Sequence, residues 1–272
     1  MARRMVIASQ KGGVGKTTVA LNLAVALAER GRRTLLVDLD PQGGIALALA
    51  KGDTELPGLA ELLMGQAEPQ EAVYPTKLEG LSLLTRGRLD PADAVEYEQA
   101  IFASGTLEDA LARTEGEADV VVIDTPAGLG LVTRAALGVS DFVMLLLQTE
   151  VLAVRSLHQA LRVVEHVRGT DNPRLHLVGI LATMVDKTLP GTLGILGEMW
   201  NGFPGVLETV IARSEAFAVA SGNGVPVAFL SGQTNPEARR FEVLADELEA
   251  RMNRLVGTTE RVDEAQPVRQ LL

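Results

Sequence analysis

The stretch SQKGGVGKTT, residues 9–18, decides the fold of this chain. It overlaps the last residue of the apolar run MVIAS and precedes the helical pattern VALNLAVAL, so a strand is expected to lead through a glycine-rich loop into a helix. Such loops hold phosphate groups with backbone N–H groups and the positive end of the helix dipole. The common spacing G-x-x-x-x-G-K-[ST] fits Gly15, Lys16 and Thr17, but it calls for glycine where this chain has Gln10.

The residues of this loop have different expected roles. The glycines let backbone N–H groups turn inward, Lys16 is expected to bridge the β- and γ-phosphates, and the Thr17 hydroxyl is expected to ligate Mg²⁺. Lys11 is not needed for that cradle, so it could point across a dimer interface to the nucleotide of a second subunit. The simpler alternative is that Lys11 is only a solvated charge on the loop. The expected nucleotide-binding residues of the loop are Lys11, Gly12, Gly13, Val14, Gly15, Lys16, Thr17 and Thr18.

Two further strands are expected to end in acidic residues. In LLVDLDPQGG an apolar run ends at Asp38 and Asp40, and in DVVVIDTPAG another delivers Asp124. The carboxyl ends of parallel strands face the ligand crevice of an open α/β sheet, so these carboxylates are expected beside the phosphate loop. Asp124, followed by Thr125 and Pro126, suits the surroundings of a bound Mg²⁺. Either acidic segment alone could be a turn or a helix cap, but together with the loop they favour a nucleotide site.

The rest of the chain predicts a single α/β domain, with a mostly parallel twisted sheet flanked by helices on both faces. Gly31 is expected to end the first helix as a left-handed C-cap. Residues 52–118 are expected to form short helices and loops around the strand LSLLT. The domain is expected to span residues 1–257, followed by a polar, mobile tail over 258–272. Apolar runs predict strands at 4–8, 34–38, 81–85, 119–124, 142–147, 175–182 and 206–211.

Composition excludes several classes of protein. The 272 residues are 47% apolar, which rules out disorder of the whole chain, and they contain no cysteine for disulfides, thiolate metal sites or iron–sulfur clusters. The longest apolar runs, such as 142–147, are far below the ~20 residues of a spanning helix, and the N-terminus lacks a signal-like region. A soluble cytoplasmic protein is therefore expected. The net charge of −10 argues against strong nonspecific attraction to DNA or anionic lipid.

The segments KGGVGKTT, LLVDLDPQG and VVVIDTPAG, in this order, resemble the deviant Walker A, A′ and Walker B motifs of the ParA/MinD ATPases. They are most similar to those of ParA-type partition and positioning proteins. The similarity extends, in weaker form, over about residues 4–255. It implies the deviant Walker A P-loop fold, binding of ATP and Mg²⁺, weak and partner-stimulated ATP hydrolysis, and a homodimer that forms on ATP binding and encloses two nucleotides.

The resemblance also assigns roles to individual residues. Lys11 corresponds to the lysine that reaches the partner's ATP, Asp40 to the group that positions or activates the attacking water, and Asp124 to the residue that holds the Mg²⁺ shell. Arg213, at the end of the segment IAR, is expected near the adenine. The implied catalytic residues are Lys11, Lys16, Asp40 and Asp124, and the implied residues around the metal are Thr17, Asp40 and Asp124.

The chain departs from the ParA pattern where DNA binding is concerned. ParA proteins commonly read I-P-R-N-V-R after the last strand and place the second arginine on a DNA-binding surface, whereas this chain reads IARSEA, with Ala216 there and Glu215 beside it. Nonspecific DNA is therefore a weakened candidate partner. Acidic neighbours favour ordinary solvated helices for the arginines that could substitute, which are Arg155, Arg162, Arg168, Arg239, Arg240, Arg251 and Arg254.

The tail also departs from the MinD branch, which ends in a basic amphipathic membrane helix. Glu260, Asp263, Glu264 and Pro267 stand where such a helix would lie, so no membrane partner is expected. The leading hypothesis is an ATPase switch in the cytoplasm, associated with the nucleoid if it binds DNA. It would act with a cargo-linked activator protein to partition or position DNA or a protein cargo.

Two alternatives remain open. The first is a metabolic ligase or kinase-like enzyme of the biotin or cobalamin pathways, which activates a carboxylate with a similar loop on the same scaffold. The segment LVDLDPQG favours the switch over this enzyme. The second is an adaptor that binds ATP without turnover, which requires Asp40 to be inert.

Overall fold

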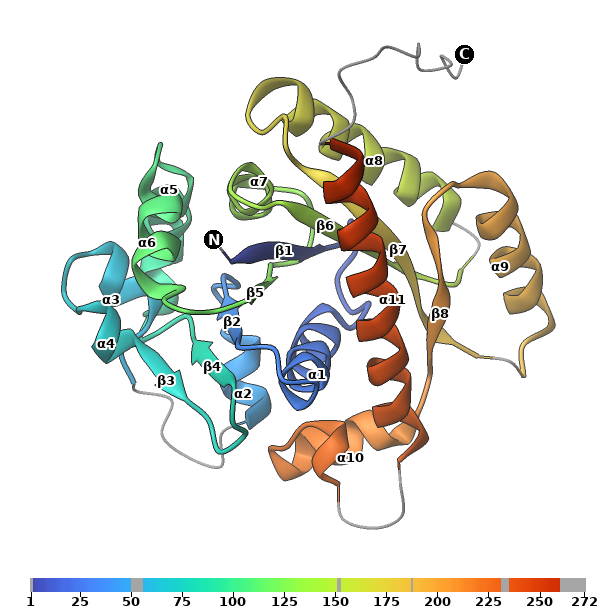
Figure 1. Ribbon diagram of the computed structural model, residues 1–272, viewed down its shortest axis with the longest axis horizontal. Coiled ribbons are helices and arrows are strands. Elements are labelled where there is room, and N and C mark those ends of the chain that lie inside the picture. The colour runs from blue at the N-terminus through green and yellow to red at the C-terminus, as the bar shows by residue number, and fades with distance from the viewer. Residues whose placement is uncertain (1, 50–55, 151–152, 187, 231–234, 260–272) are drawn as a thin grey trace.

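The computed structural model describes residues 2–49, 56–150, 153–186, 188–230 and 235–259. Within them, eight strands form one sheet in the order β3-β4-β2-β5-β1-β6-β7-β8 (Figure 1). All neighbouring strands run parallel except β3, which is antiparallel to β4. The strands are β1 (Arg3–Ala8), β2 (Thr34–Asp38), β3 (Val73–Pro75), β4 (Leu81–Leu84), β5 (Val120–Asp124), β6 (Phe142–Gln148), β7 (His176–Val185) and β8 (Val206–Ala212).

Helices pack on both faces of this sheet (Figure 1). One face carries α1 (Lys16–Glu29), α2 (Gly44–Leu49), α10 (Glu215–Asn223), the 3₁₀ helix η2 (Val227–Phe229) and α11 (Pro236–Thr259). The other face carries α3 (Leu59–Leu63), α4 (Pro69–Ala72), α5 (Ala94–Phe102), α6 (Thr106–Thr114), α7 (Leu131–Gly138), α8 (Ala153–Thr170) and α9 (Pro190–Gly202), with the 3₁₀ helix η1 (Pro91–Asp93) before α5. The predicted single α/β domain with a mostly parallel, doubly covered sheet is confirmed.

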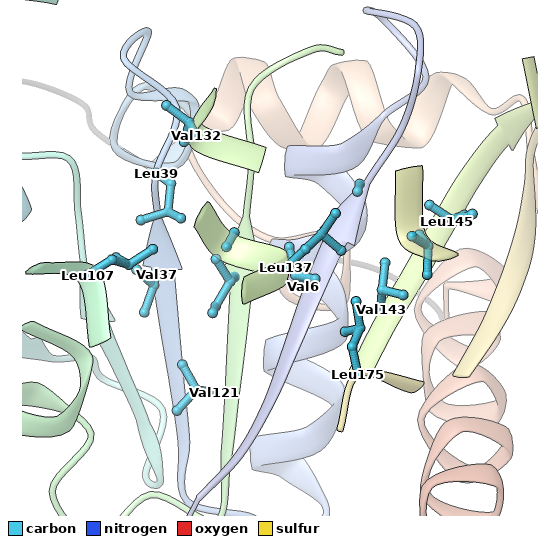
Figure 2. Close-up of a cluster of buried hydrophobic side chains, with 14 of the residues drawn as sticks. Val6, Val37, Leu39, Leu107, Val121, Val132, Leu137, Val143, Leu145 and Leu175 are labelled. Atoms are coloured by element: carbon cyan, nitrogen blue, oxygen red, sulfur yellow. The ribbon is translucent and has the colours of Figure 1, made fainter. Parts of the chain in front are cut away.

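Successive residues of the central strands enter opposite cores. Met5 of β1 packs in the cluster under α1 and α11, whereas Val6 packs in the cluster on the other face, and both are fully buried. Figure 2 shows Val6 near Val143 of the neighbouring strand β6, in the cluster that also contains Val121 of β5. A strand covered on both faces needs an uninterrupted apolar run, which is why these strands are readable in the sequence.

The seven predicted strands are present, but β3 was not predicted. Its three residues, VYP, are too few to show a period of two, and Pro75 argues against a strand. In the structure β3 pairs antiparallel with β4 at the edge of the sheet, where a proline without an N–H is tolerated. The expected loops and short helices over 52–118 therefore include an additional edge strand.

The end of α1 follows the prediction for Gly31. The helix ends at Glu29, Gly31 has a φ of 79°, and the Arg32 N–H donates to the Leu27 carbonyl at 3.1 Å. This is the pattern of a Schellman cap, in which glycine takes the left-handed position without steric cost. The cap turns the chain directly into β2.

The other end of the domain extends slightly beyond its predicted boundary. Helix α11 continues past residue 257 to Thr259, and the predicted mobile tail, apart from its first two residues, lies outside the described residues. Among the helices of the described ranges, none has the length and apolar character needed to cross a bilayer.

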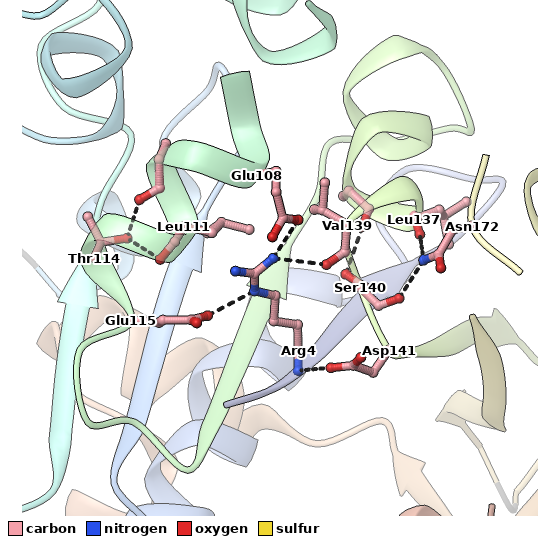
Figure 3. A network of polar contacts seen from close by, with 12 residues as sticks. Arg4, Glu108, Leu111, Thr114, Glu115, Leu137, Val139, Ser140, Asp141 and Asn172 are labelled. Atoms are coloured by element: carbon pink, nitrogen blue, oxygen red, sulfur yellow. Dashed lines mark hydrogen bonds and ion pairs between the residues drawn. The ribbon is translucent and has the colours of Figure 1, made fainter. Parts of the chain in front are cut away.

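A buried arginine joins three elements at the amino ends of the strands. Arg4 of β1 is 7% exposed. Its Nε donates to Glu115 at 2.9 Å, and its Nη1 donates to Glu108 at 2.7 Å and to the Val139 carbonyl at 3.3 Å (Figure 3). The Arg4 backbone N–H donates to Asp141 at 2.9 Å. These bonds connect β1 to α6 and to the connection between α7 and β6.

Arg4→Met should lower the free energy of unfolding by about 2–4 kcal/mol, because it leaves the largely buried Glu115 carboxylate without its partner. Urea denaturation followed by circular dichroism measures the change. Arg33→Met is the matched control, since Arg33 is 55% exposed while pairing with Glu117 and Asp119. Because water screens such an exposed pair, its loss should leave the free energy of unfolding close to that of the parent. Equal losses in the two variants would show that the Arg4 network is not a structural anchor.

Candidate functional site

The phosphate loop and the two acidic strand ends lie at one edge of the sheet. In the strand register, Asp124 at the end of β5 lies opposite Ile7 of β1 on one side and opposite Asp38 of β2 on the other. The loop that begins at Ser9 therefore emerges beside both carboxylates. The sequence-based expectation that these three segments meet at the carboxyl edge is confirmed.

Two glycines shape the turn of the loop into α1. Gly13 has a φ of 74° and Gly15 a φ of 88°, in the left-handed region that favours glycine. Gly15 is the N-cap of α1, which has neither a side-chain cap nor an acidic residue in its first turn. The first N–H groups of the helix are thus left for a ligand, and the helix dipole makes this position suitable for an anion.

Lys16 is held inside the loop by a hydroxyl group. Its side chain is almost fully buried, and Nζ donates to the Ser9 Oγ at 3.0 Å, while that Oγ donates to the Lys11 carbonyl at 2.7 Å. Burial lowers the pKa of Lys16, and the charges of Asp124 and Asp40 oppose this effect. A phosphate oxygen could replace the neutral Ser9 hydroxyl as the stronger partner. Sequence reasoning gave Ser9 no role, although it begins the quoted stretch.

Asp124 is a fully buried carboxylate. It is 0% exposed, and no hydrogen bond of normal geometry reaches either oxygen within the described residues. Burial, followed by the charge of Asp38, raises the pKa of Asp124 to about 8, and the nearby Thr17 hydroxyl and Lys16 ammonium oppose this shift. Buried carboxylates are normally paired or bound to a cation, so Asp124 and Thr17 fit a hard divalent ion.

The few protein groups at this site suit Mg²⁺ better than they suit a metal ion that is held entirely by protein side chains. Within the described ranges, no cluster of three or more His, Cys, Asp or Glu side chains could hold a metal ion. Mg²⁺ is commonly held by one or two protein groups together with substrate phosphates and water. Asp40 lies within electrostatic range of Asp124 and Lys16, so the residues predicted around the metal are brought together.

Asp38 holds the loop that carries Asp40. It is fully buried, and its two oxygens accept hydrogen bonds from the backbone N–H groups of Asp40 and Ile45, each at 3.0 Å. Burial raises the pKa of Asp38 to about 7, while these two backbone bonds act in the opposite direction. Asp38 thus fixes the start and the end of the segment between β2 and α2.

Asp40 itself begins a tight turn against the phosphate loop. Its Oδ1 accepts the Gln42 N–H at 2.9 Å, and its carbonyl accepts the Gly43 N–H at 2.8 Å. Gly44 follows so closely beside Thr17 that a Cβ there would lie 3.1 Å from the Thr17 Oγ1. The Asp40 turn is therefore held directly beside the proposed metal site.

A small pocket of about 220 Å³ opens beside the loop. Its walls come from the start of α1, the end of β7, the end of β8 and the start of α10, and Arg213 is one of the residues that line it. Met184 borders it with an unusual φ of 53°. No pattern in the sequence pointed to Met184 or to Phe217, which also lines the pocket. The lining residues are Val14, Gly15, Thr18, Val19, Thr183, Met184, Ile211, Ala212, Arg213, Ser214, Phe217 and Ala218.

Lys11 lies at the front of the loop in an ion pair within its own chain. Its Nζ contacts Oε1 of Glu150, which follows β6, and the two side chains are 41% and 38% exposed. The Lys11 ammonium thus lies outside the interior of the loop, which Lys16 occupies. No sequence signal pointed to Glu150, because the contact joins segments 139 residues apart.

The arginines that could bind DNA are mostly engaged by acidic neighbours. Ala216 lies partly buried in the first turn of α10, where its N–H donates to the Ser214 Oγ at 3.3 Å, so it offers no cation. On α8 and α11, several arginines pair with a glutamate three or four residues away. These pairs are Arg168–Glu165, Arg239–Glu242, Arg240–Glu237 and Arg251–Glu247.

Comparison with known proteins agrees with the geometry. A family model described as an AAA domain matches residues 2–177. The chromosome-partitioning ATPase Soj of Thermus thermophilus is 39% identical over 252 residues, covering 92% of this chain and 96% of that protein. The chromosome partitioning protein ParA of Caulobacter vibrioides is 38% identical over 229 residues, covering 83% of this chain and 86% of that protein.

A solved structure is similar over almost the whole chain. It is described as a cobyrinic acid a,c-diamide synthase from Mycobacterium smegmatis with bound ATP analogue and magnesium, and it is 33% identical with a TM-score of 0.76. The match covers 93% of this chain and 96% of that one. Since the family model includes the phosphate loop and both acidic strand ends, and the partition relatives match most of the chain, this chain belongs to the ParA/MinD family of P-loop ATPases.

Proposed function

We propose that this chain is a nucleotide-dependent switch, which dimerises when ATP and Mg²⁺ bind and is reset by hydrolysis. The observation that carries the proposal is the division of work between the two lysines of one loop. Lys16 fills the interior of the cradle, while Lys11 remains outside it in a half-exposed ion pair. A lysine at the outer side of the loop is suited to contact a nucleotide that is bound by a second copy of the chain.

The geometry supports a defined role for each residue of the cradle. The free N–H groups at the start of α1 and the Lys16 ammonium would bind the phosphates, with Lys16 exchanging the Ser9 hydroxyl for a phosphate oxygen. Asp124 and the Thr17 hydroxyl would hold Mg²⁺. When bound, Mg²⁺ supplies positive charge that neutralises the terminal phosphates. Asp40 would orient the attacking water and accept its proton.

The pocket beside the loop is the proposed site of the nucleoside. It adjoins Gly15 and Thr18, so a base in it would be connected to phosphates in the cradle. Most of the surface of this pocket is apolar and comes from side chains such as Val19, Met184 and Phe217. Such a surface suits the faces of a planar base. Arg213 at its rim is the proposed adenine-side contact.

The cargo is the least constrained part of the proposal. The relatives named as chromosome-partitioning proteins support partition or positioning in the cytoplasm, with a cargo-linked activator that speeds hydrolysis. Nonspecific DNA remains a candidate partner through the arginines of α8 and α11. Their ion pairs with neighbouring glutamates weaken that role, because each pair would need to open for a phosphate contact.

A carboxylate-activating ligase is the second candidate, because the Mycobacterium smegmatis relative is described as a cobyrinic acid a,c-diamide synthase. Such an amidation consumes ATP and a nitrogen donor. These 272 residues contain no cysteine that could release ammonia from glutamine by nucleophilic catalysis. The switch is the simpler proposal for this chain.

Measurements of ATP turnover, together with a DNA-binding titration, distinguish the candidates. The protein alone should hydrolyse ATP slowly, and cobyrinic acid with ammonia or glutamine should neither speed hydrolysis nor yield an amide by mass spectrometry. Titration with DNA in the presence of ATP, repeated at several salt concentrations, measures the number of phosphate contacts. Turnover that depends on the small acid would replace the switch by the ligase. Absence of DNA binding at low salt would limit the switch to a matrix other than DNA.

A further inference from the structure

We infer that Arg86 is a positioning residue for ATP hydrolysis, because its guanidinium group fixes the turn that carries Asp40. The inference rests on the proposed role of Asp40 and adds a residue outside the three sequence motifs. Arg86 lies two residues after the end of β4, on a loop beside the Asp40 turn.

The guanidinium of Arg86 contacts the turn at two places. Its Nη1 donates a hydrogen bond to the Pro41 carbonyl. It also lies against the backbone of Gly43, where a Cβ would be only 3.0 Å from Nε and 3.2 Å from Cζ. Gly43 has a φ of 64°, so glycine serves there both for the turn and for this close approach. Arg86 therefore supports the part of the turn that follows Asp40.

This support differs from that of Asp38. The Asp38 carboxylate binds the N–H groups of Asp40 and Ile45, at the two ends of the segment. Neither bond restrains the Pro41 carbonyl or Gly43, which Arg86 contacts. Movement of that middle part would shift the Asp40 carboxylate relative to the phosphate loop, and misplacement by about 1 Å can cost roughly 10²-fold in rate.

Arg86 is itself held in place by the start of α3. Its carbonyl accepts the Ala60 N–H, and the Thr85 carbonyl accepts the Leu59 N–H, both at 2.9 Å. The two segments are so close that a Cβ on Gly58 would lie 2.4 Å from the Thr85 carbonyl oxygen. A rigid backbone therefore carries Arg86, which allows its side chain to act as a fixed support.

Arg86→Gln should lower kcat for ATP about tenfold and change KM for ATP by less than twofold, because the phosphate loop is left intact. Arg86→Lys should recover part of the rate, since an ammonium group can still donate to the Pro41 carbonyl. The matched control is Arg88→Gln, two residues further along. Arg88 is 54% exposed and pairs with Glu61 at 3.4 Å, away from the Asp40 turn, so its kcat should stay within twofold of the parent.

A second measurement separates positioning from a general loss of stability. If Arg86 acts through Asp40, adding Arg86→Gln to an Asp40→Ala protein should change the residual single-turnover rate by less than twofold. An equal loss of rate in both backgrounds, or a loss explained by the unfolded fraction in circular dichroism, would overturn the inference. If Arg86→Gln does not fold, the kcat and KM of Arg86→Lys decide in the same way.

The role of Arg86 and the role of Asp40 can be disproved separately. Normal turnover in Arg86→Gln together with an inactive Asp40→Ala protein would remove Arg86 and leave the proposed function intact. Normal turnover in Asp40→Ala would remove the proposed role of Asp40 and, with it, the role of Arg86.

Discussion

Asp40→Ala should lower the rate of ATP hydrolysis by about 10²–10³-fold and cause ATP-bound dimers to accumulate. The physical reason is that Asp40, in its proposed role, acts on the attacking water, whereas the proposed phosphate cradle consists of α1, Lys16 and the surroundings of Asp124. Binding and dimerisation should therefore proceed while the step that reverses them is slowed. Phosphate release measures hydrolysis, and light scattering measures the dimer.

Two further variants sharpen this test. Asp40→Asn keeps an oxygen that can accept the Gln42 N–H, so it removes the charge while preserving the turn. It should be nearly as slow as Asp40→Ala if the carboxylate acts on water. Gln42→Ala, at an exposed neighbouring position, should hydrolyse ATP within about twofold of the parent. Normal hydrolysis by Asp40→Asn would show that the turn, and not the carboxylate, is what matters.

Lys11→Ala should weaken the ATP-dependent dimer by at least about 30-fold while changing ATP binding by the monomer no more than about threefold. Loss of a charged contact buried in an interface typically costs about 2–5 kcal/mol, which corresponds to at least this change in the dimer dissociation constant. Within the monomer, Lys16 and the N–H groups of α1 remain to hold the phosphates. Light scattering measures dimerisation, and a fluorescent ATP analogue measures binding.

Glu150→Gln is the matched control, and it should act in the opposite direction. In the proposed dimer Lys11 would have to leave Glu150, and a pair with side chains 41% and 38% exposed is worth at most about 1 kcal/mol. Its removal should therefore tighten the dimer by no more than about fivefold. If both variants instead weaken the dimer equally, Lys11 serves only its ion pair with Glu150, and the cross-subunit role is wrong.

The parts of the site that are contiguous in sequence were predictable. The loop from Ser9 to Thr18 and the strands ending at Asp38 and Asp124 are local patterns, and the rule that parallel strands end at one sheet edge brings them together. The pairing of Asp124 with Ile7 and Asp38 in the register follows that rule. The roles assigned to these residues remain predictions for the mutants above to test.

The partners of these residues were not predictable. Glu150 meets Lys11 across 139 positions of the chain, and Arg86 meets Pro41 across 45. An exposed glutamate or a loop arginine has no periodicity or motif, so its partner depends on how separate strands are ordered in the sheet. The strand β3 was missed for a related reason, since three residues gain strand structure from pairing with β4 and not from their own pattern.

The sequence by itself determined the doubly covered parallel sheet and the phosphate loop, because apolar runs and glycine positions act through local backbone sterics and burial. The tertiary structure decided which of the buried carboxylates accept hydrogen bonds and which do not. It places Asp38 in two backbone hydrogen bonds, whereas Asp124, on the neighbouring strand, is buried and accepts no hydrogen bond of normal geometry from the residues that the structure describes. That difference depends on solvent exclusion and on contacts between distant segments, which no single stretch of the sequence contains.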